Sequence, residues 1–159
     1  MSNNMDLGYE MFCYQCQETA RNKGCEIVGV CGKRPETSAR MDLLLYAVRG
    51  VSAVNRALRA KGLASREASH EVIDALFTTI TNANFDNASL DDYIKRAFEV
   101  KDSLIAVAKE HGVELPELPH VGFTAAPDEA EKYEDVTGVL ADADPDIRGL
   151  KQLAIYGCK

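Results

Sequence analysis

Residues 37–62 read TSARMDLLLYAVRGVSAVNRALRAKG and contain the clearest helical pattern in this chain of 159 residues. Apolar residues recur every three or four positions, which is typical of the buried face of an α-helix. Thr37 or Ser38 is placed to cap its start, and Gly62 is placed to end it. Gly50 lies inside the pattern at a cost of about 1 kcal/mol relative to alanine. Either the length of the helix offsets this cost, or a neighbouring segment packs closely at that position.

Two more helices are predicted from the same periodicity. One begins after Ser65 and ends at the polar run 82–87. The other begins where Ser89 and Asp92 resemble a capping arrangement, and it continues to Gly112. Because short connections between helices favour antiparallel neighbours, residues 37–112 are predicted to form an antiparallel three-helix bundle.

The remainder of the chain is predicted to be less regular. Residues 113–144 read as an extended, proline-containing connection with a weak acidic helix at 129–140. Asp144 and Pro145 have the order of an N-cap and a first helical residue, and they start a further amphipathic helix. Its apolar stripe is still running at Lys159, so this helix is either a terminal arm or the front of a longer protein, and we favour the second. The expected fold class is therefore all-α, with a cysteine-rich segment at 1–36, the bundle at 37–112, the connection at 113–144 and the start of a further helix at 145–159.

Composition and charge exclude several classes of protein. Hydrophobic residues make up 46% of the chain and charged residues 27%, and no window approaches the roughly 18 apolar residues of a membrane span. The net charge of −7 argues against nucleic acid or an anionic membrane as a partner. The first ten residues, MSNNMDLGYE, lack the basic start and the apolar run of a secretion signal. We therefore expect a cytoplasmic protein whose thiols stay reduced.

Four of the five cysteines lie close together, as Cys13, Cys16, Cys25 and Cys31, with the spacing C-x2-C-x8-C-x5-C. A reducing compartment and an odd number of cysteines argue against disulfides. Four thiolates within about 20 residues can surround one metal centre, and the glycines beside the later cysteines allow the turns that this requires. These four residues are the candidate ligands. The fifth cysteine, Cys158, is expected to be a small apolar residue on the core side of the last helix.

The spacing leaves two kinds of centre open, structural zinc and an iron–sulfur cluster. The second cysteine pair is wider than the C-x2-C pairs of most four-cysteine zinc sites, but the gaps also differ from the bacterial ferredoxin pattern. Residues 13–34 carry four basic and two acidic side chains, a balance of +2, which leaves −9 for the rest of the chain. Either these basic residues offset the negative charge of an iron–sulfur cluster, or they belong to a solvated loop; they are Arg21, Lys23, Lys33 and Arg34.

Residues 11–50 read MFCYQCQETARNKGCEIVGVCGKRPETSARMDLLLYAVRG and closely resemble the opening of the hybrid-cluster protein family, also called prismane proteins or hydroxylamine reductases. The resemblance includes Phe12, Gln15, the run Gln17-Glu18-Thr19, Gly24 and the run Cys31-Gly32-Lys33. Residues 146–157, DIRGLKQLAIYG, resemble the helix with which the family begins its second helical bundle.

The resemblance implies a [4Fe-4S] cluster on Cys13, Cys16, Cys25 and Cys31 that passes electrons to a buried hybrid iron–sulfur–oxygen cluster. It also implies that the full-length enzyme reduces hydroxylamine or nitric oxide and takes its electrons from a redox donor protein. The family's hybrid-cluster ligands come from later domains, so no catalytic residue is expected in this chain, and the hybrid cluster is expected only in the full-length protein. Two alternatives stay open, a non-enzymatic zinc-binding helical module and a stand-alone electron-transfer protein.

Two further expectations concern the three histidines and the apolar residues around the cysteines. His70, His111 and His120 do not match the family's ligand pattern and are expected to be solvated. Apolar cover that tunes the cluster is expected from a set of five residues, Met11, Phe12, Tyr14, Ile27 and Val30.

Overall fold

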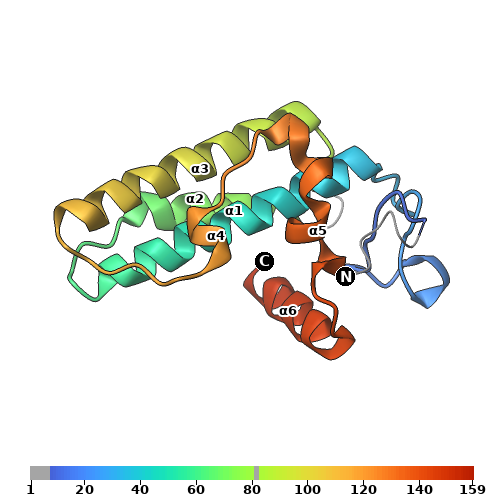
Figure 1. The fold of residues 1–159 in the computed structure, drawn as a ribbon. Coiled ribbons are helices and arrows are strands. Elements are labelled where there is room, and N and C mark those ends of the chain that lie inside the picture. The colour runs from blue at the N-terminus through green and yellow to red at the C-terminus, as the bar shows by residue number, and fades with distance from the viewer. Residues whose placement is uncertain (1–7, 81–82) are drawn as a thin grey trace.

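The computed structural model describes residues 8–80 and 83–159, and its regular structure is helical (Figure 1). Within those ranges the backbone forms no strand, only one isolated antiparallel bridge between Cys13 and Cys25, so the all-α prediction is confirmed. None of the described helices is both long enough and apolar enough to cross a membrane. The α-helices are α1 (Pro35–Arg59), α2 (Arg66–Thr78), α3 (Asn87–Glu110), α4 (Pro119–Gly122), α5 (Glu134–Thr137) and α6 (Pro145–Cys158), and the 3-10 turns are η1 (Ala20–Asn22), η2 (Pro127–Tyr133) and η3 (Val139–Ala141).

Some predicted segments extend into positions that the structure leaves out. Residues 1–7 of the predicted cysteine-rich segment 1–36 lie outside the described residues. So does residue 82, the first of the predicted polar run 82–87. The helices themselves lie close to their predicted places. Gly62 ends the first one in a turn, with φ of 73°.

Helix α1 lies at the centre of the fold. It packs against α3 along much of its length and also contacts α2, α4, η2 and α5 (Figure 1). The core contains apolar residues of α1, α2 and α3 together with Val121 of α4 and Ala130 of η2. The core is therefore not made by three helices alone, because the connection that follows α3 returns along α1 and contributes to it.

Two of the predicted helix starts are confirmed. The Ser65 hydroxyl accepts a hydrogen bond from the backbone N–H of Ala68 at 3.0 Å, which caps α2. The Asp144 carboxylate accepts from the N–H groups of Asp146 at 2.9 Å and Ile147 at 3.2 Å, which caps α6. Each cap satisfies backbone donors that have no partner within the first turn of a helix.

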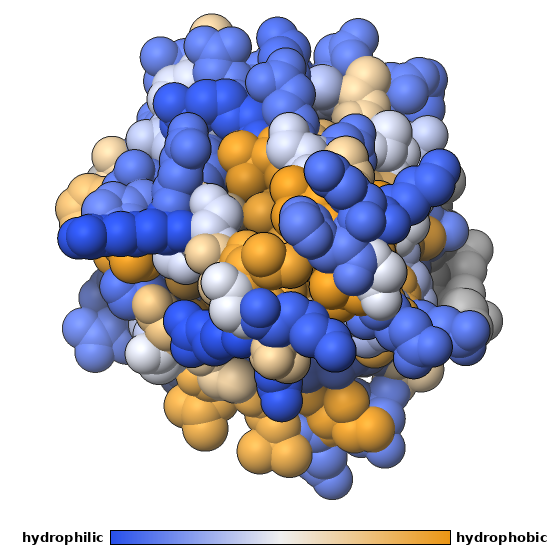
Figure 2. All heavy atoms as spheres, turned by 90° about the vertical axis from the view of Figure 1, so that its left-hand side faces the viewer, coloured by the Kyte–Doolittle hydropathy of each residue, from blue (hydrophilic) through white to orange (hydrophobic). Residues whose placement is uncertain are grey.

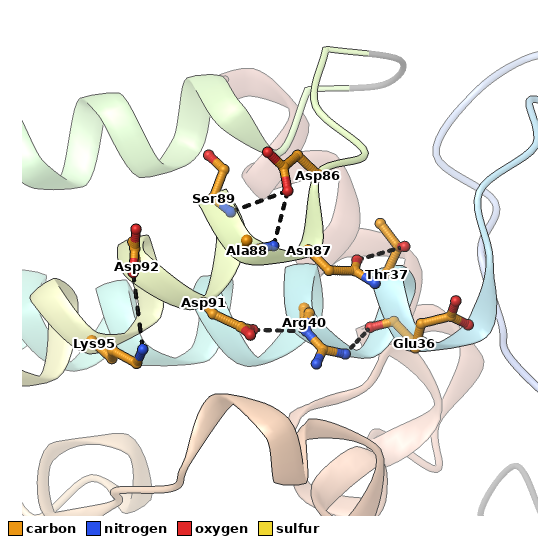
Figure 3. Close-up of polar contacts among 10 residues, drawn as sticks. All are labelled: Glu36, Thr37, Arg40, Asp86, Asn87, Ala88, Ser89, Asp91, Asp92 and Lys95. Carbon is orange, nitrogen blue, oxygen red and sulfur yellow. Dashed lines mark hydrogen bonds and ion pairs between the residues drawn. The ribbon is translucent and has the colours of Figure 1, made fainter.

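The other two predicted starts are wrong in detail. Helix α1 begins earlier than expected, at Pro35, because the fixed φ of proline is preorganised for the first helical position, and the preceding Arg34 makes no side-chain cap. Thr37 instead donates its hydroxyl to the Asn87 side chain at 2.8 Å (Figure 3). Helix α3 is capped by Asp86, whose carboxylate accepts from the N–H groups of Ala88 and Ser89, so Ser89 is not the cap.

The connection 113–144 is more structured than predicted. The expected helix at 129–140 is broken into η2, α5 and η3. The break falls at Gly138, whose backbone is extended, and a Cβ there would lie 2.6 Å from the Glu134 carbonyl oxygen. The same connection explains Gly50, because a Cβ on Gly50 would lie only 2.4 Å from the carbonyl oxygen of His120 in α4. Gly50 therefore marks close packing by a neighbouring segment, one of the two predicted possibilities.

Helix α6 presents much of its apolar stripe to solvent. Its side chains form the hydrophobic patch at the lower edge of Figure 2, and the exposed members are Ile147, Leu150, Leu153 and Tyr156. Cys158 is also exposed, so its predicted place on the core side is wrong. Polar contacts attach α6 near both of its ends, since Arg148 donates to the Asp142 carbonyl oxygen, Lys151 pairs with the Asp142 carboxylate, and Lys159 donates to the Thr79 carbonyl oxygen.

Candidate metal centre

A short antiparallel contact brings the first and third cysteines together. The N–H of Cys13 donates to the Cys25 carbonyl at 3.1 Å, and the N–H of Cys25 donates to the Cys13 carbonyl at 2.8 Å. Glu10 donates to the Glu26 carbonyl at 2.9 Å and extends the contact. Residues that exchange both hydrogen bonds carry their side chains on the same side of the ladder. The thiols of Cys13 and Cys25 therefore project to one side of this bridge.

The segment between these two cysteines is folded back by turns. The N–H and the hydroxyl of Thr19 both donate to the Cys16 carbonyl. Gly24 is buried against Phe12, and a Cβ at Gly24 would lie 2.5 Å from the Phe12 ring. The absence of a side chain at Gly24 thus allows Phe12 to pack against the strand-like backbone that carries Cys25.

Cys31 lies in a tight turn of its own. The N–H of Gly32 donates to the Gly29 carbonyl and the N–H of Gly29 donates to the Lys33 carbonyl, both at 2.8 Å. Gly32 has φ of 88°, a conformation that glycine adopts without strain. A Cβ at Gly29 would lie 3.0 Å from the Cys31 sulfur, so glycine there gives the thiol its space. This turn also determines where Lys33 lies.

The four candidate thiols are all free, and Cys25 is buried while Cys13, Cys16 and Cys31 are half-buried. Among the residues that the structure describes, no three His, Cys, Asp or Glu side chains lie close enough together to hold a metal ion. The four-ligand set therefore stays a prediction. Its donor chemistry fits a soft metal centre, because reduced thiols from one short segment, with glycines at their turns, are the ligands of zinc and of iron–sulfur clusters.

Lys33 is the basic residue that lies against the thiols. Its side chain is only 3% exposed, and its Nζ lies 3.8 Å from the Cys13 sulfur. The other three basic residues of this segment are exposed; they are Arg21, Lys23 and Arg34. None of the ion pairs found within residues 8–80 and 83–159 involves Lys33. Three of the four basic residues are thus solvated and Lys33 alone is buried, and compensation of a cluster's charge by Lys33 stays a prediction.

Two more charged groups lie near this ammonium. Burial raises the pKa of the Asp42 carboxyl to about 7, although Lys33 acts to lower it. Burial lowers the pKa of Lys159 to about 8, and the like charge of Lys33 lowers it further. The Lys159 ammonium donates to the Thr79 carbonyl at 2.9 Å and lies 3.4 Å from the Gln15 side-chain oxygen. Burial also raises the pKa of the Cys13 thiol, and Lys33 opposes that rise.

The sequence of the chain matches a known family. The sequence profile of the Prismane/CO dehydrogenase family matches residues 11–159, which include all four candidate ligands. The chain belongs to the Prismane/CO dehydrogenase family. This confirms the resemblance that residues 11–50 and 146–157 indicated.

Curated relatives of this Prismane-family chain carry the name hydroxylamine reductase. The protein of Porphyromonas gingivalis is 42% identical over 152 residues, which cover 94% of this chain and 28% of that protein. The protein of Bacteroides fragilis is 46% identical over 159 residues, with 94% and 27% covered. The protein of Halothermothrix orenii is 42% identical over 157 residues, with 94% and 28% covered. The chain thus spans little more than a quarter of the length of these relatives.

The remaining predictions about the surroundings of this Prismane-family site have mixed outcomes. Met11 is fully buried, but Ile27 and Val30 are 62% and 60% exposed and do not cover the thiols. His70 is exposed as predicted. His120 is not solvated, because it is half-buried with its ring 5.8 Å from that of Tyr46, and burial lowers its pKa.

The buried charges beside the thiols were not predicted from the sequence. Asp42 is almost fully buried near the start of α1, within the apolar run that begins at Met41. A charged residue on the buried face of a predicted helix is a signal that could have been recognised, because such groups are rarely buried without a partner. The burial of Lys33 next to exposed Arg34 had no such signal, since the turn from Gly29 to Lys33 decides it.

Proposed function

We propose that this chain is the N-terminal, electron-entry portion of a hydroxylamine reductase of the Prismane family. In this proposal the four thiolates of Cys13, Cys16, Cys25 and Cys31 hold a [4Fe-4S] cluster. The name of the curated relatives, the match to the family and the four free thiols of one segment support it.

The observation that carries the proposal is the buried ammonium of Lys33 beside the Cys13 sulfur. Removing a charge from water is costly unless an opposite charge or hydrogen bonds compensate it. A neutral thiol compensates poorly, because it is a weak hydrogen-bond acceptor. The Asp42 carboxyl interacts electrostatically with Lys33, and a thiolate-bound cluster, which carries net negative charge, would add a second negative partner at the Cys13 sulfur.

When bound, an iron–sulfur cluster accepts and releases single electrons. The chain's own residues would hold and shield it. The bridge between Cys13 and Cys25 fixes two thiols on one side, and the space at Gly29 admits Cys31. Met11, which is fully buried, and Phe12, which packs against Gly24, would limit the access of water to this segment. Lys33 keeps a positive charge at the Cys13 sulfur.

In the whole enzyme, hydroxylamine takes up two electrons and two protons to give ammonia and water, or two nitric oxide molecules take up the same number to give nitrous oxide and water. The ligands of the catalytic hybrid cluster would come from domains beyond the segment that this chain spans. A cytoplasmic redox donor protein would supply the electrons one at a time, and this chain would receive them.

The test is the metal content of protein purified without oxygen. We expect a brown protein with broad absorption near 400 nm and about four iron and four sulfide per chain. A colourless protein with one zinc per chain would refute the proposal and establish the zinc-binding alternative. Protein reconstituted with iron and sulfide that loses both on desalting would also contradict it.

A further inference from the structure

Lys33 differs from every other basic residue of the cysteine segment. It is the one that is buried, and its Nζ lies 3.8 Å from a candidate ligand sulfur. Its backbone is fixed by the hydrogen bond from the Gly29 N–H to the Lys33 carbonyl at 2.8 Å. The ammonium is thus held next to Cys13 by the same turn that positions Cys31.

A fixed positive charge at this position acts differently on the two oxidation states of a cluster. Reduction by one electron adds one negative charge, and a nearby cation stabilises that charge more strongly in a buried site than in water. Net charge and hydrogen bonds to the sulfurs are among the factors that determine the potential of iron–sulfur clusters. The exposed charges of Arg21, Lys23 and Arg34 are screened by solvent and salt, so they contribute much less.

We propose that Lys33 sets the reduction potential of the cluster, because its buried ammonium stabilises the reduced form. This inference rests on the function proposed above. Lys33 is then a positioning residue that acts through Cys13, since it holds charge at the sulfur without exchanging an electron or a proton itself. Its removal lowers the potential and makes the cluster harder to reduce.

The experiment compares three variants of the whole chain after anaerobic reconstitution. Lys33→Met removes the charge and keeps most of the side-chain volume, and Lys33→Arg keeps the charge. Lys23→Met is the matched control, because it removes the same charge from the same segment at an exposed position. Each protein is titrated with dithionite and mediator dyes, and the reduced cluster, which has gained one electron from the dye, is measured by electron paramagnetic resonance.

We expect the equilibrium constant for reduction of Lys33→Met to fall at least about tenfold, which corresponds to a potential about 59 mV lower for one electron. Lys33→Arg and Lys23→Met are expected to remain within about threefold of the unchanged chain. Iron and sulfide contents that match the unchanged chain would show that the shift is electrostatic rather than a loss of the centre.

The inference is overturned if Lys33→Met has the potential of the unchanged chain, or if Lys23→Met lowers it equally. If Lys33→Met holds no cluster, the iron and sulfide contents of Lys33→Gln and Lys33→Arg are compared instead. Retention in the arginine variant alone supports a requirement for charge, whereas loss in all three variants overturns it in favour of a purely steric role. An unchanged chain without iron and sulfide refutes the proposed function itself, so the two failures are distinct.

Discussion

Gly50 offers the sharpest test of how the connection 113–144 packs on α1. A Cβ at this position would lie 2.4 Å from the His120 carbonyl oxygen and 2.9 Å from the Lys101 side chain. The lysine chain can move, but the carbonyl belongs to the backbone of α4. That backbone is held in turn, because the Lys101 ammonium donates to the carbonyl of Phe123 directly after α4. Gly50→Ala therefore displaces α4 from α1.

Two opposing effects determine the size of the change. Alanine in the middle of a helix gains about 1 kcal/mol over glycine. Overpacking a well-filled contact costs roughly 1–3 kcal/mol. The contact lies far inside the normal range of Cβ distances and involves backbone, so we take the upper part of that cost. The expected net loss is about 1–2 kcal/mol, or a midpoint about 2 to 8 °C lower.

The assay is urea and thermal unfolding followed by circular dichroism at 222 nm. Ser52→Ala is the matched control, because it places the same residue two positions away on the exposed side of the same helix. It is expected to be as stable as the unchanged chain or a few tenths of a kcal/mol more stable. A Gly50→Ala chain at least as stable as that control would refute the close approach of α4 to α1.

Three other predictions follow from the site and from the contacts between helices. Cys25→Ser is expected to abolish iron retention and leave the 222 nm signal nearly unchanged, because the helices have their own core; a collapse of that signal would contradict this. The Asp42 carboxyl has a pKa of about 7 in the folded chain, against an ordinary value of 3.8, so between these pH values it binds more protons in the folded than in the unfolded chain. Its contribution to the free energy of unfolding therefore falls as the pH rises from about 4 to about 7 and is constant above that. Asp42→Asn should remove this decline, which is worth at most about 4 kcal/mol over the whole range and at most about 3 kcal/mol above pH 5. Unfolding of the metal-free chain at pH 5 and pH 8 measures the second figure, and an equal change in stability in both proteins would count against the prediction. The half-buried pair of Arg40 and Asp91, at 2.7 Å (Figure 3), should show a coupling of about 1–2 kcal/mol in a double-mutant cycle, and a coupling near zero would rule this out.

Helix positions could be predicted from the sequence where local chemistry decides them alone. Ser65 and Asp144 cap their helices as expected, because each lies directly before the first helical residue and its side-chain oxygen accepts from N–H groups of the first turn. The start of α3 was placed wrongly because Asp86 and Ser89 are both good caps. Contacts with α1 also hold the start of α3, since Asn87 bonds to Thr37 and Asp91, in the next turn, bonds to Arg40 (Figure 3). Such contacts join residues about 50 positions apart, and periodicity does not reveal them.

The same limit applies to the candidate site. The cysteines and the glycines beside them could be recognised from spacing. Lys33 and Arg34 are neighbours of the same charge, yet one is buried against Cys13 and the other is exposed. The difference depends on the turn that begins at Gly29, which no composition or charge count describes.

The buried charges bear on whether the cysteine segment is a structural clamp or a redox site. Lys33 and Asp42 are nearly excluded from solvent, and Lys159 is half-buried beside them. Buried ions are weak contributors to stability, and well-packed apolar residues of similar size are often equally stable or more so. Four thiolates around zinc and around an oxidised four-iron cluster both leave net negative charge, so an ammonium 3.8 Å from the Cys13 sulfur would offset part of that charge in either centre. Under the proposed function the same ammonium has a second effect, because a centre that gains one negative charge on reduction is stabilised more in its reduced state. A reduction potential that depends on Lys33 is therefore expected of the iron–sulfur centre alone, since zinc does not change its oxidation state.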